Sequence, residues 1–159
     1  MPIAFSELVR LGRTAWTRQS TIEVTKRDIH LFAESTGDYN PIHCDDEKAQ
    51  EHGLPCAIAH GDWIDSALPK FIGFWEELIS LSSQGIIIFN VKKECTYKLP
   101  VPIGSHLYAE LQVLEYKVLA RAAMLSLGFR ILIEGHATKV PAASGLRMLH
   151  IRRTIVPCI

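Results

Sequence analysis

Two hydrophobic periods divide the chain. Between positions 64 and 79 the apolar residues recur every three or four positions, which predicts a helix packed against a broad surface. From Gly85 onward the apolar residues form a compact run at 86–89, and they then alternate with polar residues over 107–113 and 123–133. A period of two is typical of strands. The first half of the chain is therefore predicted to be helical and the second half to form a sheet.

Turn residues separate the predicted strands without any connector long enough to be a helix. These breaks lie at Pro100, residues 102–104, Gly135 and residues 141–145. Short connections favour antiparallel pairing over parallel strand–helix–strand units. Helices early and strands late indicate an α+β fold, in which an antiparallel sheet wraps around one apolar central helix.

Local signals set the ends of the earlier helices. Thr25 followed by Asp28 resembles a capping box, and Gly37 suits a helix C-terminus, so Asp38 should lie just beyond a helix end. A second short helix is predicted from about Asp45, with acidic residues in its first turn, to Gly53.

The central helix should begin near Gly61 or Asp62. Pro69 lies well inside its apolar pattern, where a proline removes one backbone hydrogen bond and crowds the preceding turn. We therefore expect a bend near Ala67 or Leu68.

Composition narrows the classes of function. A length of 159 residues suits one domain over residues 1–159, and 17 basic residues balance 17 acidic ones, so no overall field favours nucleic acid or an anionic membrane. No basic leader followed by an apolar run opens the chain, and no run of eighteen apolar residues predicts a membrane span. The cysteines show no CxxC pair, which favours free thiols and a cytoplasmic location: Cys44, Cys56, Cys95 and Cys158.

Residues 37–43 are the strongest candidate for chemistry. They read Gly-Asp-Tyr-Asn-Pro-Ile-His, so a carboxylate at Asp38 and an imidazole at His43 are five positions apart. Pro41 fixes its own φ and biases Asn40 toward extended geometry, from which we expect a non-helical turn. An Asp beside a His can share the acid and base roles needed to move a proton to or from a bound water.

This stretch resembles the hydratase 2 motif of the MaoC-like family, which contains R-specific enoyl-CoA hydratases and related dehydratases. That motif has an aromatic residue, a Gly-Asp-x-Asn-Pro-aliphatic-His core, and a small residue six positions later. The family also has a His-Gly pair at the start of its central helix, matched here by His60-Gly61. The motif positions are filled by Phe32, Gly37, Asp38, Asn40, Pro41, Ile42, His43 and Ala49.

The resemblance implies a hot-dog fold and a metal-free, cofactor-free hydro-lyase. Such an enzyme adds water to a trans-2-enoyl thioester to give the R-3-hydroxyacyl thioester, or removes it. By this resemblance Asp38 and His43 hold and activate the water, and one of them protonates C2. The backbone N–H of Gly61 serves the thioester oxyanion, for which a glycine at a helix N-terminus is suited. Asn40 buttresses the turn, and His60 either shapes the oxyanion loop or packs locally.

The substrate carrier is expected to be coenzyme A, with acyl carrier protein as the alternative. A lone hot-dog protomer leaves sheet edges uncovered, so a homodimer is expected, as the resemblance also implies. Basic residues could meet the carrier's phosphates, although a solvated strand face is the favoured interpretation of them: Lys92, Lys93, Lys98, Arg152 and Arg153.

Other interpretations of the same residues stay open. Asp38 could be only a turn residue and His43 a packed histidine, and a metal could be bound by Asp38, His43, His60 and Asp62, although their spacing matches no standard zinc site. Cys44 is expected to be structural, not a nucleophile. Rival functions are a hot-dog thioesterase and an acyl-binding accessory subunit.

The start of the central helix departs from the family. Aliphatic and small residues are usual there, whereas this chain has Asp62, Trp63, Asp65 and Pro69. Trp63 and Asp62 could line the acyl pocket, and Trp75 could do so from the same helix, although aromatic residues at helical spacing are more often core. These departures could narrow the acyl site, make it more polar, or signal an unusual acyl group such as a branched or polyketide intermediate.

Overall fold

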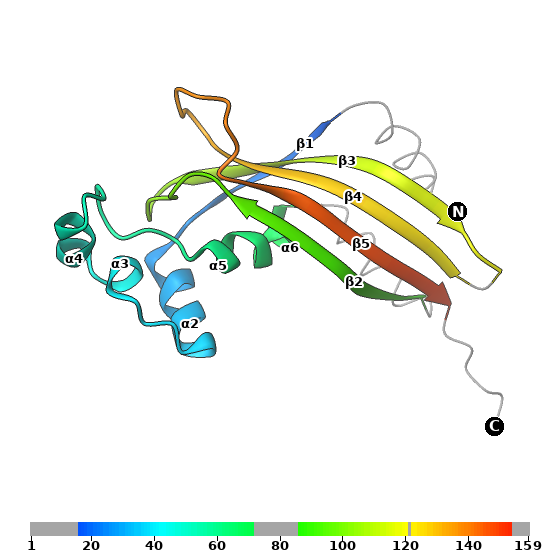
Figure 1. Cartoon of the computed structure of the whole chain (residues 1–159), viewed down its shortest axis with the longest axis horizontal. Coiled ribbons are helices and arrows are strands. Elements are labelled where there is room, and N and C mark those ends of the chain that lie inside the picture. The colour runs from blue at the N-terminus through cyan, green and yellow to red at the C-terminus, as the bar shows by residue number, and fades with distance from the viewer. Residues whose placement is uncertain (1–15, 72–85, 121, 154–159) are drawn as a thin grey trace.

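The computed structural model describes residues 16–71, 86–120 and 122–153 (Figure 1). Trp75 and Cys158, both considered above, lie outside these ranges, as does the helical pattern beyond Phe71. In chain order the elements are β1 (Thr17–Glu23), α2 (Lys26–Thr36), α3 (Pro41–Cys44), α4 (Asp46–Glu51), α5 (Gly61–Ser66), α6 (Leu68–Phe71), β2 (Ile86–Tyr97), β3 (His106–Val118), β4 (Ala122–Ile133) and β5 (Ala143–Arg153).

The five strands form one sheet in the order β1-β3-β4-β5-β2, and every neighbouring pair is antiparallel. The sheet curves over α5 and α6, while α2, α3 and α4 gather beyond one end of it (Figure 1). This is the α+β arrangement that the two hydrophobic periods predict. The strands β1 and β2 are the edges of this sheet.

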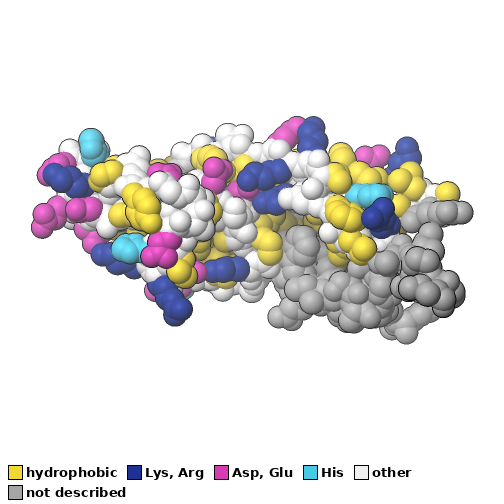
Figure 2. Space-filling model, turned by 90° about the horizontal axis from the view of Figure 1, so that it is seen from below, with side chains coloured by type: hydrophobic (Ala, Val, Ile, Leu, Met, Phe, Trp, Pro, Cys, Tyr) yellow, Lys and Arg dark blue, Asp and Glu magenta, His cyan; other side chains and the backbone are white. Residues whose placement is uncertain are grey.

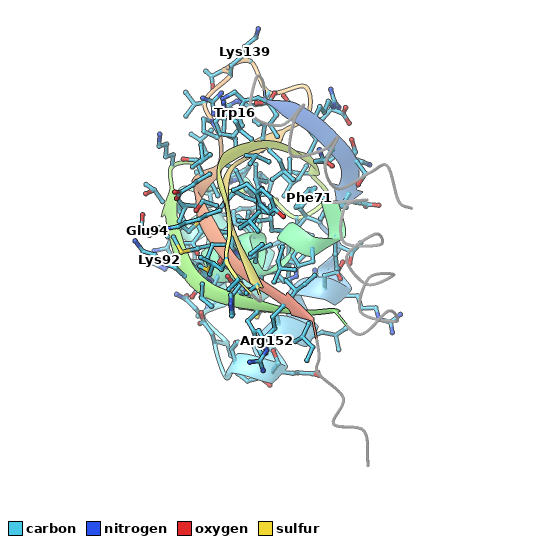
Figure 3. The ribbon with its side chains drawn as sticks, turned by 90° about the vertical axis from the view of Figure 1, so that its right-hand side faces the viewer. Trp16, Phe71, Lys92, Glu94, Lys139 and Arg152 are labelled. Atoms are coloured by element: carbon cyan, nitrogen blue, oxygen red, sulfur yellow. The ribbon has the colours of Figure 1, made fainter. Side chains whose placement is uncertain are left out.

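The core lies between the concave face of the sheet and the central helices. Along β3 the buried residues are Leu107, Ala109, Leu111 and Val113, as the alternating pattern predicts. Phe71 of α6 is fully buried with them, and Figure 3 shows its side chain directed inward from the helical side. Full burial of each large apolar side chain contributes about 1.5–3 kcal/mol, so this core supplies most of the favourable folding energy.

The predicted ends of α2 are confirmed. The Thr25 hydroxyl accepts a hydrogen bond from the Asp28 N–H at 3.1 Å. Gly37 ends the helix with φ 77°, a left-handed conformation that favours glycine, and its N–H donates to Ala33 O at 2.8 Å. Asp38 therefore begins directly after a helix end.

The two other helix predictions are also confirmed within the described ranges. Helix α4 has Asp45 as its N-cap and is followed by Gly53 at φ 80°. The central helix breaks at Ala67, between α5 and α6, where Pro69 was expected to bend it.

Two features of the sheet were not predicted. Strand β1 is an edge strand with mostly polar residues, so its sequence carries little alternation, and only its pairing with β3 defines it. Strand β5 begins at Ala143, inside the break expected at 141–145. Gly145 was interpreted as a break, but it lies within the strand. A glycine is needed there because a Cβ would fall 1.9 Å from the Glu94 carbonyl oxygen of β2.

Within the described ranges, no helix is long and apolar enough to cross a membrane. Cys44, Cys56 and Cys95 are free. Acidic and basic side chains gather over the end of the molecule formed by α2, α3 and α4 (Figure 2).

Candidate active site

The stretch that carries Asp38 and His43 contains a short helix, so the expectation of a non-helical turn is wrong. Asn40 is extended, as predicted, with φ −52° and ψ 126°. Pro41 then occupies the first position of α3, where its missing N–H would have no intrahelical acceptor and its fixed φ suits the helix. The Asn40 side chain caps this turn by accepting a hydrogen bond from the Ile42 N–H at 3.3 Å.

His43 is oriented by the backbone of a distant segment. Its Nδ1–H donates to the Ile58 carbonyl oxygen at 2.8 Å, because a carbonyl can only accept. This bond fixes the neutral tautomer with the lone pair on Nε2. Burial lowers the pKa of His43 below its ordinary 6.5, and the neighbouring His60 adds to that effect, against opposing contributions from Ile58 and Asp38. Neutral His43 at pH 7 can accept a proton.

His60 contacts both Asp38 and His43. It is 2% exposed, and its Nε2–H donates to the Asp38 carbonyl oxygen at 2.9 Å. Its ring lies against the His43 ring, with centroids 3.9 Å apart, and near Phe32 at 5.1 Å. Its Nδ1 is buried without a hydrogen-bond partner among the described residues. His60 thus holds the Asp38 backbone and packs against His43 at the same time.

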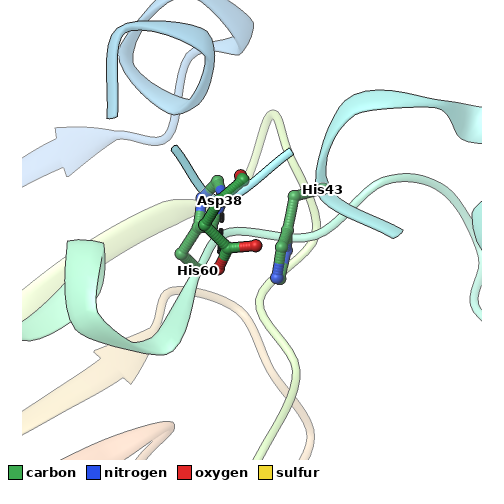
Figure 4. A group of neighbouring side chains, drawn as sticks. All are labelled: Asp38, His43 and His60. Carbon is green, nitrogen blue, oxygen red and sulfur yellow. Dashed lines mark hydrogen bonds and ion pairs between the residues drawn. The ribbon is translucent and has the colours of Figure 1, made fainter. Parts of the chain in front are cut away.

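Asp38 provides the charged group of the cluster. Its side chain is 53% exposed, and its Oδ2 lies 4.0 Å from His60 Nε2. Its Oδ1 accepts a hydrogen bond from the Asn40 N–H at 3.3 Å. Figure 4 shows Asp38, His43 and His60 converging from three segments, and one ligand-type atom from each lies within 4.8 Å of the others.

Gly61 is the first residue of α5, after His60 as N-cap. No residue in the described ranges accepts a hydrogen bond from its N–H. The ring of Tyr97 lies so close that a Cβ on residue 61 would be 3.1 Å from two ring carbons. The Tyr97 hydroxyl in turn donates to Asp62 Oδ1 at 2.7 Å. A Cβ at position 61 would therefore require the Tyr97 ring to shift by a few tenths of an ångström.

Comparison with known proteins connects this geometry to a family. A family model described as MaoC like domain matches residues 7–128, more than half of the 159 residues. The chain belongs to the MaoC-like family. Its hot-dog fold, expected from the motif, is confirmed.

Three relatives illustrate the similarity of this MaoC-like chain. It is 27% identical over 100 residues to the 3-hydroxyacyl-thioester dehydratase Z of Mycobacterium tuberculosis, which covers 63% of this chain and 61% of that protein. It is 29% identical over 126 residues to the (R)-specific enoyl-CoA hydratase of Rhodospirillum rubrum, and this alignment covers 77% of the present chain and 83% of that protein. The solved structure of the (R)-hydratase from A. caviae superposes on this chain with a TM-score of 0.64 and 21% sequence identity. The superposition covers 85% of the present chain and 92% of that structure.

The MaoC-like site gathers three of the four residues considered above as metal ligands. Asp38, His43 and His60 come together as the metal interpretation requires, but Asp62 bonds to Tyr97. The two imidazole rings are tilted relative to each other, with an interplanar angle of 31°. Each ring has one nitrogen bonded to a backbone carbonyl, an arrangement that metal-bound histidines share and that leaves the other nitrogen with its lone pair.

Cys44 follows His43 within α3 and is partly buried. Burial raises the pKa of its thiol, and the nearby Asp38 raises it further. A thiol that resists ionisation is a weak nucleophile, which fits the structural role expected of it. Trp63 is buried in the core of this MaoC-like chain, with the Lys70 ammonium 5.6 Å from its ring centroid.

The sequence interpretation missed three contacts. Tyr97, which covers Gly61, gave no signal because it lies 36 residues away on a strand. Asp65 was noted only as a departure from the family, yet it forms ion pairs with Lys93 and Arg147. Lys93 pairs with Asp65 while its side chain stays 40% exposed, and Lys92 points outward from β2 beside Glu94 (Figure 3), so both lysines reach solvent from β2. An acidic residue within an apolar helical pattern was the available signal.

Proposed function

We propose that this protein is a hydro-lyase that adds water to a trans-2-enoyl thioester, giving the R-3-hydroxyacyl thioester, or that catalyses the reverse dehydration. The observation that carries the proposal is the convergence of Asp38 and His43 on His60, the residue directly before Gly61, whose N–H has no acceptor among the described residues. Family membership and the relatives named above support the same reaction class.

In the proposed hydration, a water molecule lies between Asp38 and His43. His43, neutral and with Nε2 free, removes one proton as the water oxygen bonds to C3 of the enoyl group. The C2=C3 electron pair moves toward the thioester carbonyl, and charge develops on its oxygen. A proton delivered from the Asp38–His43 pair to C2 completes the addition, so the site regains its starting protonation state.

The developing oxyanion accepts a hydrogen bond from the Gly61 N–H in this proposal. A donor fixed at a helix start needs no reorganisation when charge forms, which is why such groups stabilise transition states effectively. Asn40 supports the arrangement by capping α3, and His60 supports it by binding the Asp38 carbonyl. Asp62 and Trp63 remain proposed boundaries of the acyl site. Neither a metal nor an organic cofactor is part of the proposed reaction.

Purified protein mixed with crotonyl-CoA tests the reaction. Loss of enoyl absorbance without thiol release marks hydration, whereas thiol release marks a thioesterase. Absence of both across several chain lengths, and with acyl carrier protein thioesters, supports an accessory acyl-binding subunit and rejects the proposal. Asp38→Asn and His43→Gln should each slow hydration by at least about a hundredfold. A near-normal rate in either variant removes that residue from the mechanism.

We also propose a homodimer formed through the β2 edge. An exposed edge strand presents unpaired backbone groups, and β2 exposes apolar side chains at Phe89, Val91 and Tyr97. Tyr97 also covers Gly61, so a partner at this edge would lie beside the site. Analytical ultracentrifugation should give twice the chain mass, and replacing Val91 by Lys should shift the protein toward the monomer. A wild-type monomer at micromolar concentration would reject this assembly.

A further inference from the structure

Asp65 of α5 is a fully buried carboxylate held by two cations from the sheet. Its Oδ1 lies 2.6 Å from Arg147 Nη2, and its Oδ2 forms an ion pair with the Lys93 ammonium. Arg147 on β5 and Lys93 on β2 are partners in the strand register. With its amide in the orientation that satisfies both of its groups, Asn90 accepts from Arg147 Nη1 at 2.7 Å. The guanidinium is thereby held from two sides.

Arg147 also replaces a hydrogen bond that Pro69 removes. In a continuous helix the Asp65 carbonyl would accept from the N–H of residue 69, but proline has none. Arg147 Nη2 donates to this carbonyl at 2.7 Å. One nitrogen thus binds both the side chain and the backbone of Asp65, at the end of α5 where carbonyls lack intrahelical donors. Asp65, Pro69 and Arg147 form a coupled arrangement that ends α5 and attaches it to β5.

A second attachment lies one turn earlier on the same side of α5. Asp62 and Asp65 are three residues apart and so share a helix face. Asp62 accepts the Tyr97 hydroxyl at 2.7 Å, and the Tyr97 ring lies against Gly61. Both attachments connect the six residues of α5 to the β2–β5 edge of the sheet through directional hydrogen bonds. Apolar packing alone would permit more sliding than these bonds allow.

We propose that Arg147 is a positioning residue for the Gly61 N–H and acts through Asp65. The inference rests on the proposed function of Gly61 as oxyanion donor. Because α5 has only six residues, displacement of its end at Asp65 also moves its start at Gly61. A shift of about 1 Å at a reacting centre can lower the rate about a hundredfold, so loss of the attachment should reduce turnover more than substrate binding.

The test compares three variants in the full-length protein. Asp65→Leu combined with Arg147→Met removes both buried charges in favour of apolar groups of similar size, which preserves folding better than leaving one charge unpaired. Lys93 is 40% exposed and can then reach water. Arg147→Lys keeps the charge without the planar fork of donors. Arg18→Met is the matched control, since Arg18 of β1 forms an exposed ion pair with Glu134, which lies in the turn after β4.

Crotonyl-CoA hydration by the double variant should show kcat lowered by about 10- to 100-fold. KM should change less than threefold, and the melting temperature should stay within a few degrees of wild type. Arg147→Lys should recover part of kcat, and Arg18→Met should match wild type. An unchanged kcat in a folded double variant overturns the inference, as does a loss confined to KM.

Two measurements without turnover separate this inference from the proposed reaction. Butyryl-CoA has no C2=C3 double bond and therefore cannot be hydrated. With a ¹³C label at its thioester carbonyl, the carbonyl infrared band should shift to lower frequency when wild type binds it, because the Gly61 N–H donates to the oxygen. This shift should be lost in the double variant. Amide hydrogen exchange over residues 61–66 should be faster in that variant at equal melting temperature. If wild type fails to hydrate any enoyl thioester but exchange changes as stated, the proposed function fails while the attachment role survives. Unchanged exchange and an unchanged band overturn the inference.

Discussion

Replacing Asp65 by Asn should destabilise the protein through a specific electrostatic defect. The substitution keeps the size of the side chain and an oxygen that can accept from Arg147, but it removes the negative charge between two cations. Asp65 is fully buried and the Arg147 side chain is only 13% exposed, so the unpaired guanidinium cannot regain full hydration. The defect lies in charge compensation and not in packing.

The expected size follows from the burial of each partner. Removing one member of a buried ion pair typically costs about 3–5 kcal/mol. Lys93 is 40% exposed and can turn to solvent, and Arg147 keeps its bonds to the residue 65 carbonyl and to Asn90, which lowers the cost. We therefore expect a loss of about 2–3 kcal/mol in the free energy of unfolding. For a chain of this length that corresponds to a fall of about 4–12 °C in melting temperature.

Urea denaturation followed by tryptophan fluorescence measures this change, and calorimetry gives the melting temperature. The apolar double variant Asp65→Leu with Arg147→Met should be less destabilised than Asp65→Asn alone, because it leaves no buried charge behind. A loss below about 0.5 kcal/mol for Asp65→Asn, a size usual for surface changes, would refute the electrostatic reasoning. So would a double variant that is less stable than the single one.

The remaining predictions concern the catalytic pair and two close contacts. Because burial lowers the pKa of His43 below 6.5, kcat/KM for hydration should be level near pH 7 and fall as pH drops through that lowered pKa, where protonation fills Nε2; a rate that rises toward acid would exclude His43 as the base. Gly61→Ala should lower kcat at least about tenfold, since its Cβ would meet the Tyr97 ring at 3.1 Å; steady-state kinetics with normal activity would show that the ring can move away freely. Gly145→Ala should abolish soluble expression or greatly lower the melting temperature, because its Cβ would fall 1.9 Å from Glu94 O; a stable variant would mean that β2 and β5 can separate locally.

Local chemistry explains which parts of the fold were predictable. Thr25 and Gly37 mark the ends of α2 because capping and left-handed φ depend on those residues themselves. The alternation along β3 predicts its buried face, whereas residues 125–129 of β4 are all buried, which alternation alone does not predict. The edge strand β1 was not predictable, since its residues gain strand geometry only from pairing with β3. The α3 turn was misjudged because Pro41 is compatible both with an extended turn and with a helix start.

The sequence by itself determined the motif: a helix stop at Gly37, a carboxylate and an imidazole five residues apart, and a glycine after His60. These are properties of neighbouring residues and of the backbone geometry they permit. Only the tertiary structure decided that His43 is held by Ile58, that Tyr97 covers Gly61, and that Arg147 donates to the Asp65 carbonyl, to which Pro69 cannot donate. Those contacts join residues from 15 to 82 positions apart, and their geometry depends on how the sheet closes over the central helix.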